Sequence, residues 1–169
     1  MANAIFAPAT VFGSGGNTPY NLAVADFNGD SLPDVAAANI GGTAGVLTNN
    51  GLGGFGTAAS YSTVAIYNVS AGDFNSYGRP EMAVTAYPNV RIMINNGLGG
   101  FTSGGLFNNP SGAYNIATGD LNGDGKLDLV VGNSGISALL GDGAGNFTSI
   151  GYLPNSQSYY IHDVQIVDL

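Results

Sequence analysis

The chain has 169 residues, enough for one domain with a hydrophobic core, and only 8% of them are charged, whereas 44% are hydrophobic and 28 are glycine. Because 10% are also aromatic, this composition excludes a disordered chain and favours a turn-rich β protein. The formal net charge is −8, with three basic residues, so the lysine and arginine clusters that nucleic acid and anionic membranes require are missing, and cations are the favoured partners.

Signals of cross-linking and targeting are also missing from these residues. There is no cysteine, so disulfide bonds are excluded. The first residues, MANAIFAPATVF, have neither a basic segment nor a long apolar segment, so we expect no signal peptide in this stretch. No run of about 18 apolar residues exists, so we expect no membrane insertion.

An Asp-rich stretch recurs in register along the chain. It reads DFNGDSLPD at 26–34, DFNSYGRPE at 73–81 and DLNGDGKLD at 120–128. Consecutive copies begin 47 residues apart, and Asp168 follows at nearly the same spacing. Because neighbouring motifs share this spacing, the sequence predicts three complete repeats with partial repeats on either side.

Each repeat predicts four short β-strands. In the third repeat they span about 114–119, 128–133, 136–140 and 147–153. The second strand follows the Asp-rich stretch, and a hairpin motif, NNGLGGF or GDGAGNF, leads into the fourth. No segment has room for a helix with a 3.6-residue period. Four antiparallel strands in a unit of about 40 to 50 residues are typical of a β-propeller blade.

These residues resemble the FG-GAP/VCBS repeat, the calcium-binding blade of integrin-like β-propellers. The resemblance rests on DLNGDGKLDLVVGN followed by GDGAGNF and covers essentially the whole chain. It implies an all-β propeller in which the Asp-rich loop joins the innermost strand of a blade to the second. We therefore expect a single repeat region over residues 1–169, with the outer strand and linker of a preceding blade at 5–19, blades at 20–61, 67–107 and 114–153, and the first strand of a further blade at 159–169.

The Asp-rich loops predict sites for a hard cation, with an ordinary polar turn as the alternative. In the pattern D-x-[DN]-x-D-G-x-x-D, positions one, three, five and nine offer side-chain oxygens, and position seven offers a backbone carbonyl. This oxygen set suits Ca²⁺ better than Mg²⁺ or Zn²⁺. An EF-hand is excluded because its twelfth position should be Glu, and here it is Ala37 or Val131. The expected ligands of two structural Ca²⁺ ions are Asp26, Asn28, Asp30, Leu32 and Asp34 in the first loop, and Asp120, Asn122, Asp124, Lys126 and Asp128 in the third.

The middle loop, 73–81, departs from this pattern. Tyr77 occupies the fifth position and Glu81 the ninth, and Arg79 brings a positive charge close to both. A phenol is a poor Ca²⁺ ligand, so we expect this loop to hold no metal ion. Arg79 is expected to pair with Asp73 or Glu81 instead.

The face opposite the Asp-rich loops is the expected recognition face, because its loops differ most between repeats and variable loops on a rigid scaffold carry recognition. Its aromatic residues are candidates for contact with a sugar or a protein, and packing between blades is the alternative reading of them. The candidate contact residues are Tyr87, Tyr159 and Tyr160, whereas Tyr20, Tyr67 and Tyr114 recur with the strands and are expected to belong to the scaffold.

No catalytic constellation stands out. The only histidine is His162, there is no cysteine, and the patterned carboxylates belong to the Asp-rich loops. We therefore expect a noncatalytic, extracellular, calcium-binding β-propeller module, secreted or on the surface of a bacterial cell, for adhesion or lectin-like recognition of a protein or carbohydrate. The alternatives are a structural subunit of an extracellular surface assembly or filament, and an accessory propeller of a secreted enzyme.

Three blades are too few to close a propeller, so open blade faces are expected at both ends of the array. The sequence leaves two ways to cover them. Either the chain is a fragment of a longer propeller or a larger repetitive assembly, or copies of it associate through these open edges into a closed homo-oligomer.

Overall fold

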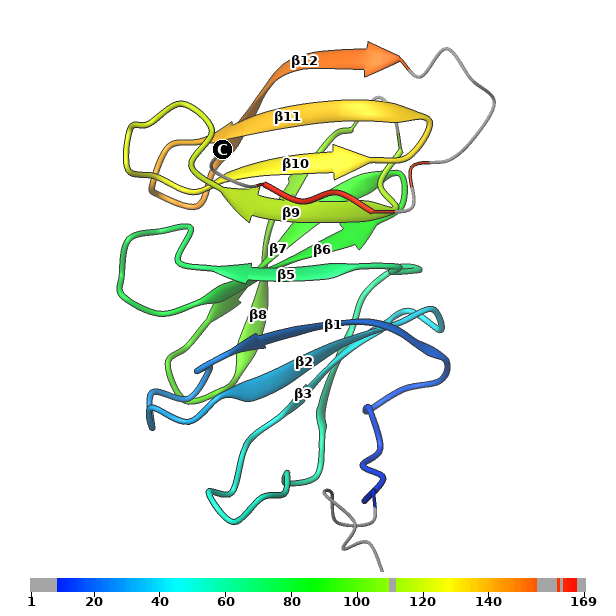
Figure 1. Cartoon of the computed structure of the whole chain (residues 1–169), viewed down its shortest axis with the longest axis vertical. Helices are drawn as coiled ribbons and strands as arrows, with labels where there is room; N and C mark the ends of the chain where they lie inside the picture. The colour runs from blue at the N-terminus through cyan, green and yellow to red at the C-terminus, as the bar shows by residue number, and fades with distance from the viewer. Residues whose placement is uncertain (1–8, 110–111, 155–160, 162, 167–169) are drawn as a thin grey trace, which may run out of the picture.

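The structure is a computed structural model that describes residues 9–109, 112–154, 161 and 163–166. Within these ranges the chain is all-β and forms three four-stranded antiparallel sheets, which confirms the predicted propeller blades (Figure 1). None of the described segments forms a helix long and apolar enough to cross a membrane. The strands are β1 (Pro19–Ala25), β2 (Asp34–Asn39), β3 (Thr43–Leu47), β4 (Ala59–Ser62), β5 (Val69–Gly72), β6 (Glu81–Ala86), β7 (Asn89–Asn95), β8 (Phe101–Phe107), β9 (Asn115–Gly119), β10 (Asp128–Gly132), β11 (Gly135–Gly141) and β12 (Phe147–Pro154).

Each sheet is a meander whose strands pair in chain order. We call the sheets blade 1 (β1–β4), blade 2 (β5–β8) and blade 3 (β9–β12). The strands of blade 3 begin and end within one residue of the predicted bounds. In every blade the Asp-rich loop joins the first strand to the second, and the three loops lie at the same end of the sheets, on the left in Figure 1.

The burial of a strand depends on its position in the blade. Strand β6, with the sequence EMAVTA, is buried along its whole length. A strand covered on both faces is mostly small or apolar, which explains why its sequence does not alternate, and its one charged residue, Glu81, stands at its first position. The outermost strand β12 is the opposite case, because only its first residue, Phe147, is buried.

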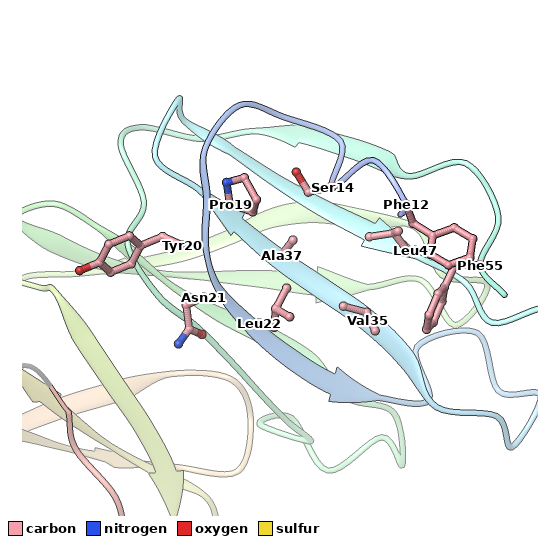
Figure 2. Close-up of a pocket in the computed structure, with 10 residues that line it drawn as sticks. All are labelled: Phe12, Ser14, Pro19, Tyr20, Asn21, Leu22, Val35, Ala37, Leu47 and Phe55. Carbon is pink, nitrogen blue, oxygen red and sulfur yellow. The ribbon is translucent and has the colours of Figure 1, made fainter. Parts of the chain in front are cut away.

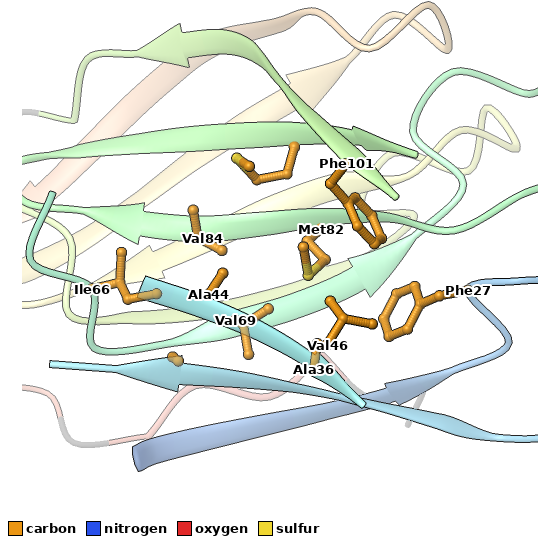
Figure 3. Close-up of a cluster of buried hydrophobic side chains, with 11 residues drawn as sticks. Phe27, Ala36, Ala44, Val46, Ile66, Val69, Met82, Val84 and Phe101 are labelled. Carbon is orange, nitrogen blue, oxygen red and sulfur yellow. The ribbon is translucent and has the colours of Figure 1, made fainter. Parts of the chain in front are cut away.

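The hydrophobic core lies between the blades (Figure 3). Small and branched side chains of β2 and β3 face larger ones of blade 2, and a second cluster joins blade 2 to blade 3 in the same way. Blade 2 therefore packs one face against blade 1 and the other face against blade 3. The first cluster comprises Phe27, Ala36, Ala38, Ala44, Val46, Ile66, Val69, Met82, Val84, Met93 and Phe101.

The innermost strands of neighbouring blades also carry polar contacts. Asn68 Nδ2 donates a hydrogen bond to Asn115 Oδ1 at 3.1 Å, and the hydroxyls of Ser70 and Thr118 lie 2.7 Å apart. These side-chain bonds join β5 and the residue just before it to β9, across two different sheets. They fix how far one blade can slide on the next.

The carboxy-terminal segment, residues 161 and 163–166, runs beside β9 (Figure 1). The Ile161 N–H donates to the Asn133 carbonyl at 2.9 Å, and Asn115 Nδ2 donates to the Ile161 carbonyl at 2.5 Å. The segment thus lies where the first strand of a fourth blade would lie, although its described residues form no regular strand. Residues 5–8 of the predicted outer strand and 167–169 lie outside the described residues.

Candidate metal-binding loops and tyrosine ladder

The first Asp of each Asp-rich loop organises the turn by accepting backbone N–H groups. In the first loop, the Asp26 carboxylate accepts hydrogen bonds from Gly29 at 2.7 Å, Asp30 at 3.2 Å and Ser31 at 2.7 Å. Three converging donors place a negative charge at the centre of the turn. The loop is therefore held in shape by the carboxylate that the sequence assigns to the first ligand position.

The third loop repeats this arrangement. The Asp120 carboxylate accepts from Gly123 at 2.7 Å, Asp124 at 3.2 Å and Gly125 at 2.8 Å. These hydrogen bonds, that of Gly125 first, lower the pKa of Asp120 below its ordinary value, because they stabilise its charged form. Asp120 is thus an ionised carboxylate at neutral pH.

The side-chain oxygens at the third and fifth positions of the loop accept backbone N–H groups along the turn, and Asn28 is half-buried whereas Asp30 is exposed. Asn28 Oδ1 accepts the Asp30 N–H at 2.9 Å, and Asp30 Oδ1 accepts the Leu32 N–H at 2.8 Å. Among the described residues of the three loops, an ion pair forms in the third loop alone, where Lys126 Nζ lies 3.8 Å from Asp124 Oδ2. That pair is exposed, so it contributes little stability. The corresponding acceptors in the third loop are Asn122 Oδ1 and Asp124 Oδ1, which accept from Asp124 and Lys126 at 2.9 Å each.

The ninth-position carboxylate is turned inward in both loops. Asp128 is fully buried and accepts the N–H of Leu121 at 2.9 Å with one oxygen and the N–H of Gly141 at 2.8 Å with the other. It therefore ties the start of its loop to the end of β11. Asp34 makes the same brace, accepting from Phe27 at 3.0 Å and from Asn49 at 2.7 Å.

The middle loop keeps the backbone shape of the other two. Its fourth and sixth positions, Ser76 and Gly78, have φ angles of 61° and 75°. A left-handed φ is costly for a residue other than glycine, so the fold imposes this shape on Ser76. Positive φ values recur at the same two positions of the other loops, at Gly29, Ser31, Gly123 and Gly125.

Glu81 provides the brace in the middle loop. It is 1% exposed and accepts hydrogen bonds from the Phe74 N–H at 3.0 Å and from Asn75 Nδ2 at 2.8 Å. Burial raises the pKa of Glu81 above its ordinary value of 4.5, because desolvation penalises the charged form more than these hydrogen bonds stabilise it. Among the described residues Glu81 thus keeps the bond to the start of its loop, at an electrostatic cost, but not the second bond to the end of the third strand that Asp34 and Asp128 make.

The predicted ion pair of Arg79 with Asp73 or Glu81 is wrong. Arg79 Nη1 donates to the Asn96 carbonyl at 3.3 Å, and among the described residues neither carboxylate lies within 4.0 Å of a guanidinium nitrogen. The guanidinium lies against Gly97, in the hairpin between β7 and β8. The long Arg79 side chain extends beyond the loop. Within the loop, the carboxylates of Asp73 and Glu81 already accept hydrogen bonds from backbone and amide N–H groups.

The first and third loops offer only oxygen donors, which is the chemistry that Ca²⁺ prefers. Within the described ranges, no three acidic or histidine side chains come close enough together to hold a metal ion. The reason is visible in the braces, since Asp34 and Asp128 face backbone N–H groups rather than the exposed oxygens of Asp30 and Asp124. The exposed part of each loop fits a Ca²⁺ ion by donor type, and the inward carboxylate retains unused lone pairs.

The first and middle loops are also held by the hairpin of the following blade, a contact that the Asp-rich motif alone does not predict. Phe27 is buried and meets the ring of Phe101 at a centroid distance of 5.5 Å, and its carbonyl accepts the Gly99 N–H at 3.1 Å. The position after the first Asp is thus a contact between blades. In the middle loop, Phe74 makes the same contacts with Phe147 at 5.5 Å and with the Gly145 N–H at 2.8 Å.

At the opposite end of the blades, four tyrosines form a continuous row that we call the tyrosine ladder. Tyr67 and Tyr114 stack at a centroid distance of 4.1 Å, as expected of scaffold residues. Tyr20 meets Tyr67 edge-on at 6.2 Å, and Tyr87 meets Tyr114 at 5.9 Å. Tyr20 and Tyr87 are 58% and 51% exposed. The other aromatic candidates, Tyr159 and Tyr160, and the single histidine, His162, lie outside the described residues.

Comparison with solved structures finds similarity to a lectin and to a toxin pore. A lectin from Agrocybe aegerita, described by its specific recognition of non-reducing terminal N-acetylglucosamine, superposes with a TM-score of 0.55 at 24% identity over 80% of this chain. The chain spans 38% of that lectin's length. The pore of the Photorhabdus luminescens Tc holotoxin matches with a TM-score of 0.46 at 17% identity, over 83% of this chain and 7% of the toxin chain. At 24% identity the likeness to the lectin is one of fold.

No curated protein sequence matches the chain. A family model does match it, the one described as an FG-GAP-like repeat, over residues 26–84 and 73–131. Both matches begin at the first Asp of an Asp-rich loop and end inside the second strand of the next blade. The two matches begin 47 residues apart, which is the spacing of the Asp-rich loops, and together they span more than half of the chain, so the chain belongs to the family of FG-GAP-like repeat proteins.

Proposed function

We propose that this chain is a noncatalytic recognition module that binds a carbohydrate at the tyrosine ladder. The observation that carries the proposal is the pair of exposed rings, Tyr20 and Tyr87, at the two ends of a row whose inner members are already stacked. Apolar ring faces held on a rigid scaffold are suited to stacking against sugar rings, and their hydroxyls supply polar contacts.

The fold supports this function without identifying the sugar. The Agrocybe aegerita lectin, which shares the fold, is described as recognising terminal N-acetylglucosamine. We therefore propose N-acetylglucosamine-terminated glycans as the first ligands to test, with a protein ligand on the same face as the alternative. An extracellular location, where such ligands occur, is part of the proposal.

The experiment is a glycan array followed by calorimetric titration of the best ligand. Tyr20→Ala and Tyr87→Ala are expected to weaken binding roughly 5- to 30-fold, because each removes a stacking surface worth about 1 to 2 kcal/mol. Tyr77→Ala is the matched control, since Tyr77 is also exposed but lies in the middle Asp-rich loop, at the other end of the blades. An array without specific binding, or Tyr20→Ala with unchanged affinity, would count against the proposal.

We further propose that Ca²⁺ binds the first and third loops and stabilises them, and that the middle loop holds no metal. The support is the exposed oxygen set at Asp26, Asn28 and Asp30, which the third loop repeats, together with Tyr77 at the fifth position of the middle loop. An ion there would offset the repulsion between carboxylates that share one turn, so binding would favour the folded blade. Its role is structural, because the ladder lies at the opposite end of the sheets.

A further inference from the structure

The outer face of blade 1 is hollow and apolar. A cavity of about 450 Å³ opens there between β1 and the segment around Phe12 (Figure 2). Leu22 and Val24, which point outward from β1, are 61% and 63% exposed. We call this surface the head face. It comprises Leu22, Val24, Val35, Ala37, Leu47 and Phe55.

The same positions are buried in the other two blades. In the strand pairing, Leu22 corresponds to Val69 and Ile116, which are 3% and 6% exposed. Val69 packs against blade 1 and Ile116 against blade 2. The head face is therefore one half of a blade-to-blade interface. The remaining correspondences are Val35 with Met82 and Leu129, Ala37 with Val84 and Val131, Leu47 with Met93 and Leu139, and Phe55 with Phe101 and Phe147.

The complementary half lies on the far side of blade 3, which we call the tail face. Leu121 is 40% exposed, whereas its counterparts Phe27 and Phe74 are buried. Ile136 is 39% exposed, whereas its counterparts in blades 1 and 2 are fully buried. The carboxy-terminal segment covers the inner edge of this face. The tail face comprises Leu121, Val130, Ile136 and Ala138.

We propose that the head face of one copy of this chain docks on the tail face of a second copy, with β1 of the docking copy taking the place beside β9 that the carboxy-terminal segment holds in the single chain. A second copy is the expected occupant because the interface between blades repeats along the chain. Blades 2 and 3 each pack a surface equivalent to the head face on a surface of the preceding blade that is equivalent to the tail face. The chain itself carries one further surface of each kind. Two internal contacts supply the template, the edge-to-face pairs Phe27–Phe101 and Phe74–Phe147, each at 5.5 Å. By the same register, Leu121 meets Phe55 of the second copy.

The contact is heterologous, because two different surfaces meet. Such contacts build a closed ring when the rotation between copies returns to its start, and an open filament when it does not. Blades related by a propeller rotation favour a ring. Covering the head face also removes an exposed apolar patch that a monomer would leave in water.

The association is tested by sedimentation velocity of the 169-residue chain across the micromolar range. Wild type is expected to form species larger than the monomer as its concentration rises. Leu22→Glu and Ile136→Glu are each expected to weaken association at least tenfold, because each places a charge in an apolar contact. Leu52→Glu is the matched control, since Leu52 is exposed on the β3–β4 hairpin and belongs to neither face. Melting curves show whether each variant remains folded.

Mixing the two variants tests the head-to-tail geometry. Leu22→Glu keeps an intact tail face and Ile136→Glu an intact head face, so a mixture is expected to form a one-to-one dimer although neither variant associates alone. A wild type that stays monomeric throughout would overturn the proposal. So would a mixture that stays monomeric, or an Ile136→Glu variant that associates like wild type, which would indicate pairing of two head faces instead.

Discussion

Replacing the buried brace of the third loop, Asp128→Ala, is expected to destabilise the fold strongly even when no metal is present. The substitution leaves two backbone N–H groups, of Leu121 and Gly141, without the carboxylate that accepts them at 2.9 and 2.8 Å. A hydrogen bond to a charged group contributes about 1.5 to 3 kcal/mol, and a buried donor left unsatisfied adds its desolvation cost. We expect a loss of about 3 kcal/mol or more in the free energy of unfolding.

The assay is thermal unfolding in the presence of a chelator. For a chain of this size, 1 kcal/mol corresponds to roughly 2 to 4 °C, so Tm should fall by about 10 °C. Asp124→Ala is the control, because Asp124 is exposed and accepts the Lys126 N–H within the turn. Its loss should cost less than about 1 kcal/mol without metal. Equal shifts for the two variants in chelator would refute the assignment of Asp128 as a structural brace.

Three further predictions follow from the middle loop. Burial raises the pKa of Glu81 above 4.5, so the folded state binds this proton more tightly than the unfolded state, and its contribution to stability is lost as pH rises through the raised pKa. Glutamine does not titrate, so Glu81→Gln removes this dependence of stability on pH. The Tm of Glu81→Gln relative to wild type should therefore increase between about pH 4 and pH 7; a Tm difference that does not change with pH would contradict this. Ser76→Gly should stabilise the fold by about 0.5 to 1 kcal/mol in chemical denaturation, because glycine adopts its left-handed φ of 61° without strain, and a loss of stability would argue against that backbone shape. Phe74→Ala should cost about 3 to 5 kcal/mol, since it empties a buried site between two blades; a cost below about 1 kcal/mol would show that the blades do not depend on this contact.

The fold was predictable because the period of the sequence is also the period of the structure. One repeat of 47 residues places the loop, the hairpin and the aromatic residue in register, and the structure preserves that register strand by strand. The middle loop shows the strength of this rule. Ser76 adopts the left-handed backbone conformation of its glycine counterparts, although serine does not favour that conformation.

The direction of the side chains was harder to predict than the strands. The loop motif assigns Asp34 and Asp128 to the same ligand set as the exposed residues, whereas the structure buries both against backbone N–H groups. A motif gives the spacing of carboxylates along the chain, and it does not say which of them faces inward. Whether the two carboxylates also reach a metal ion stays a prediction.

The sequence also did not predict which side chains would be exposed at the two ends of the array of blades. Leu22 and Val69 occupy equivalent positions and have similar chemistry, yet one is exposed and the other buried. The difference arises from the neighbour that covers Val69 and is missing beside Leu22, which is a property of the array and not of the residue. Tyr87 is a similar case, because only the structure joins it to the tyrosines of the inner strands.

The calcium content of the chain is the most direct test of a calcium-stabilised propeller module. In a calorimetric titration of chelator-treated protein we expect two Ca²⁺ ions per chain, with dissociation constants of about 10⁻⁴ to 10⁻³ M. Asp30→Ala and Asp124→Ala should each remove one ion, and Asp73→Ala should remove none. Absence of Ca²⁺ binding, or a third ion lost with Asp73→Ala, would contradict the account.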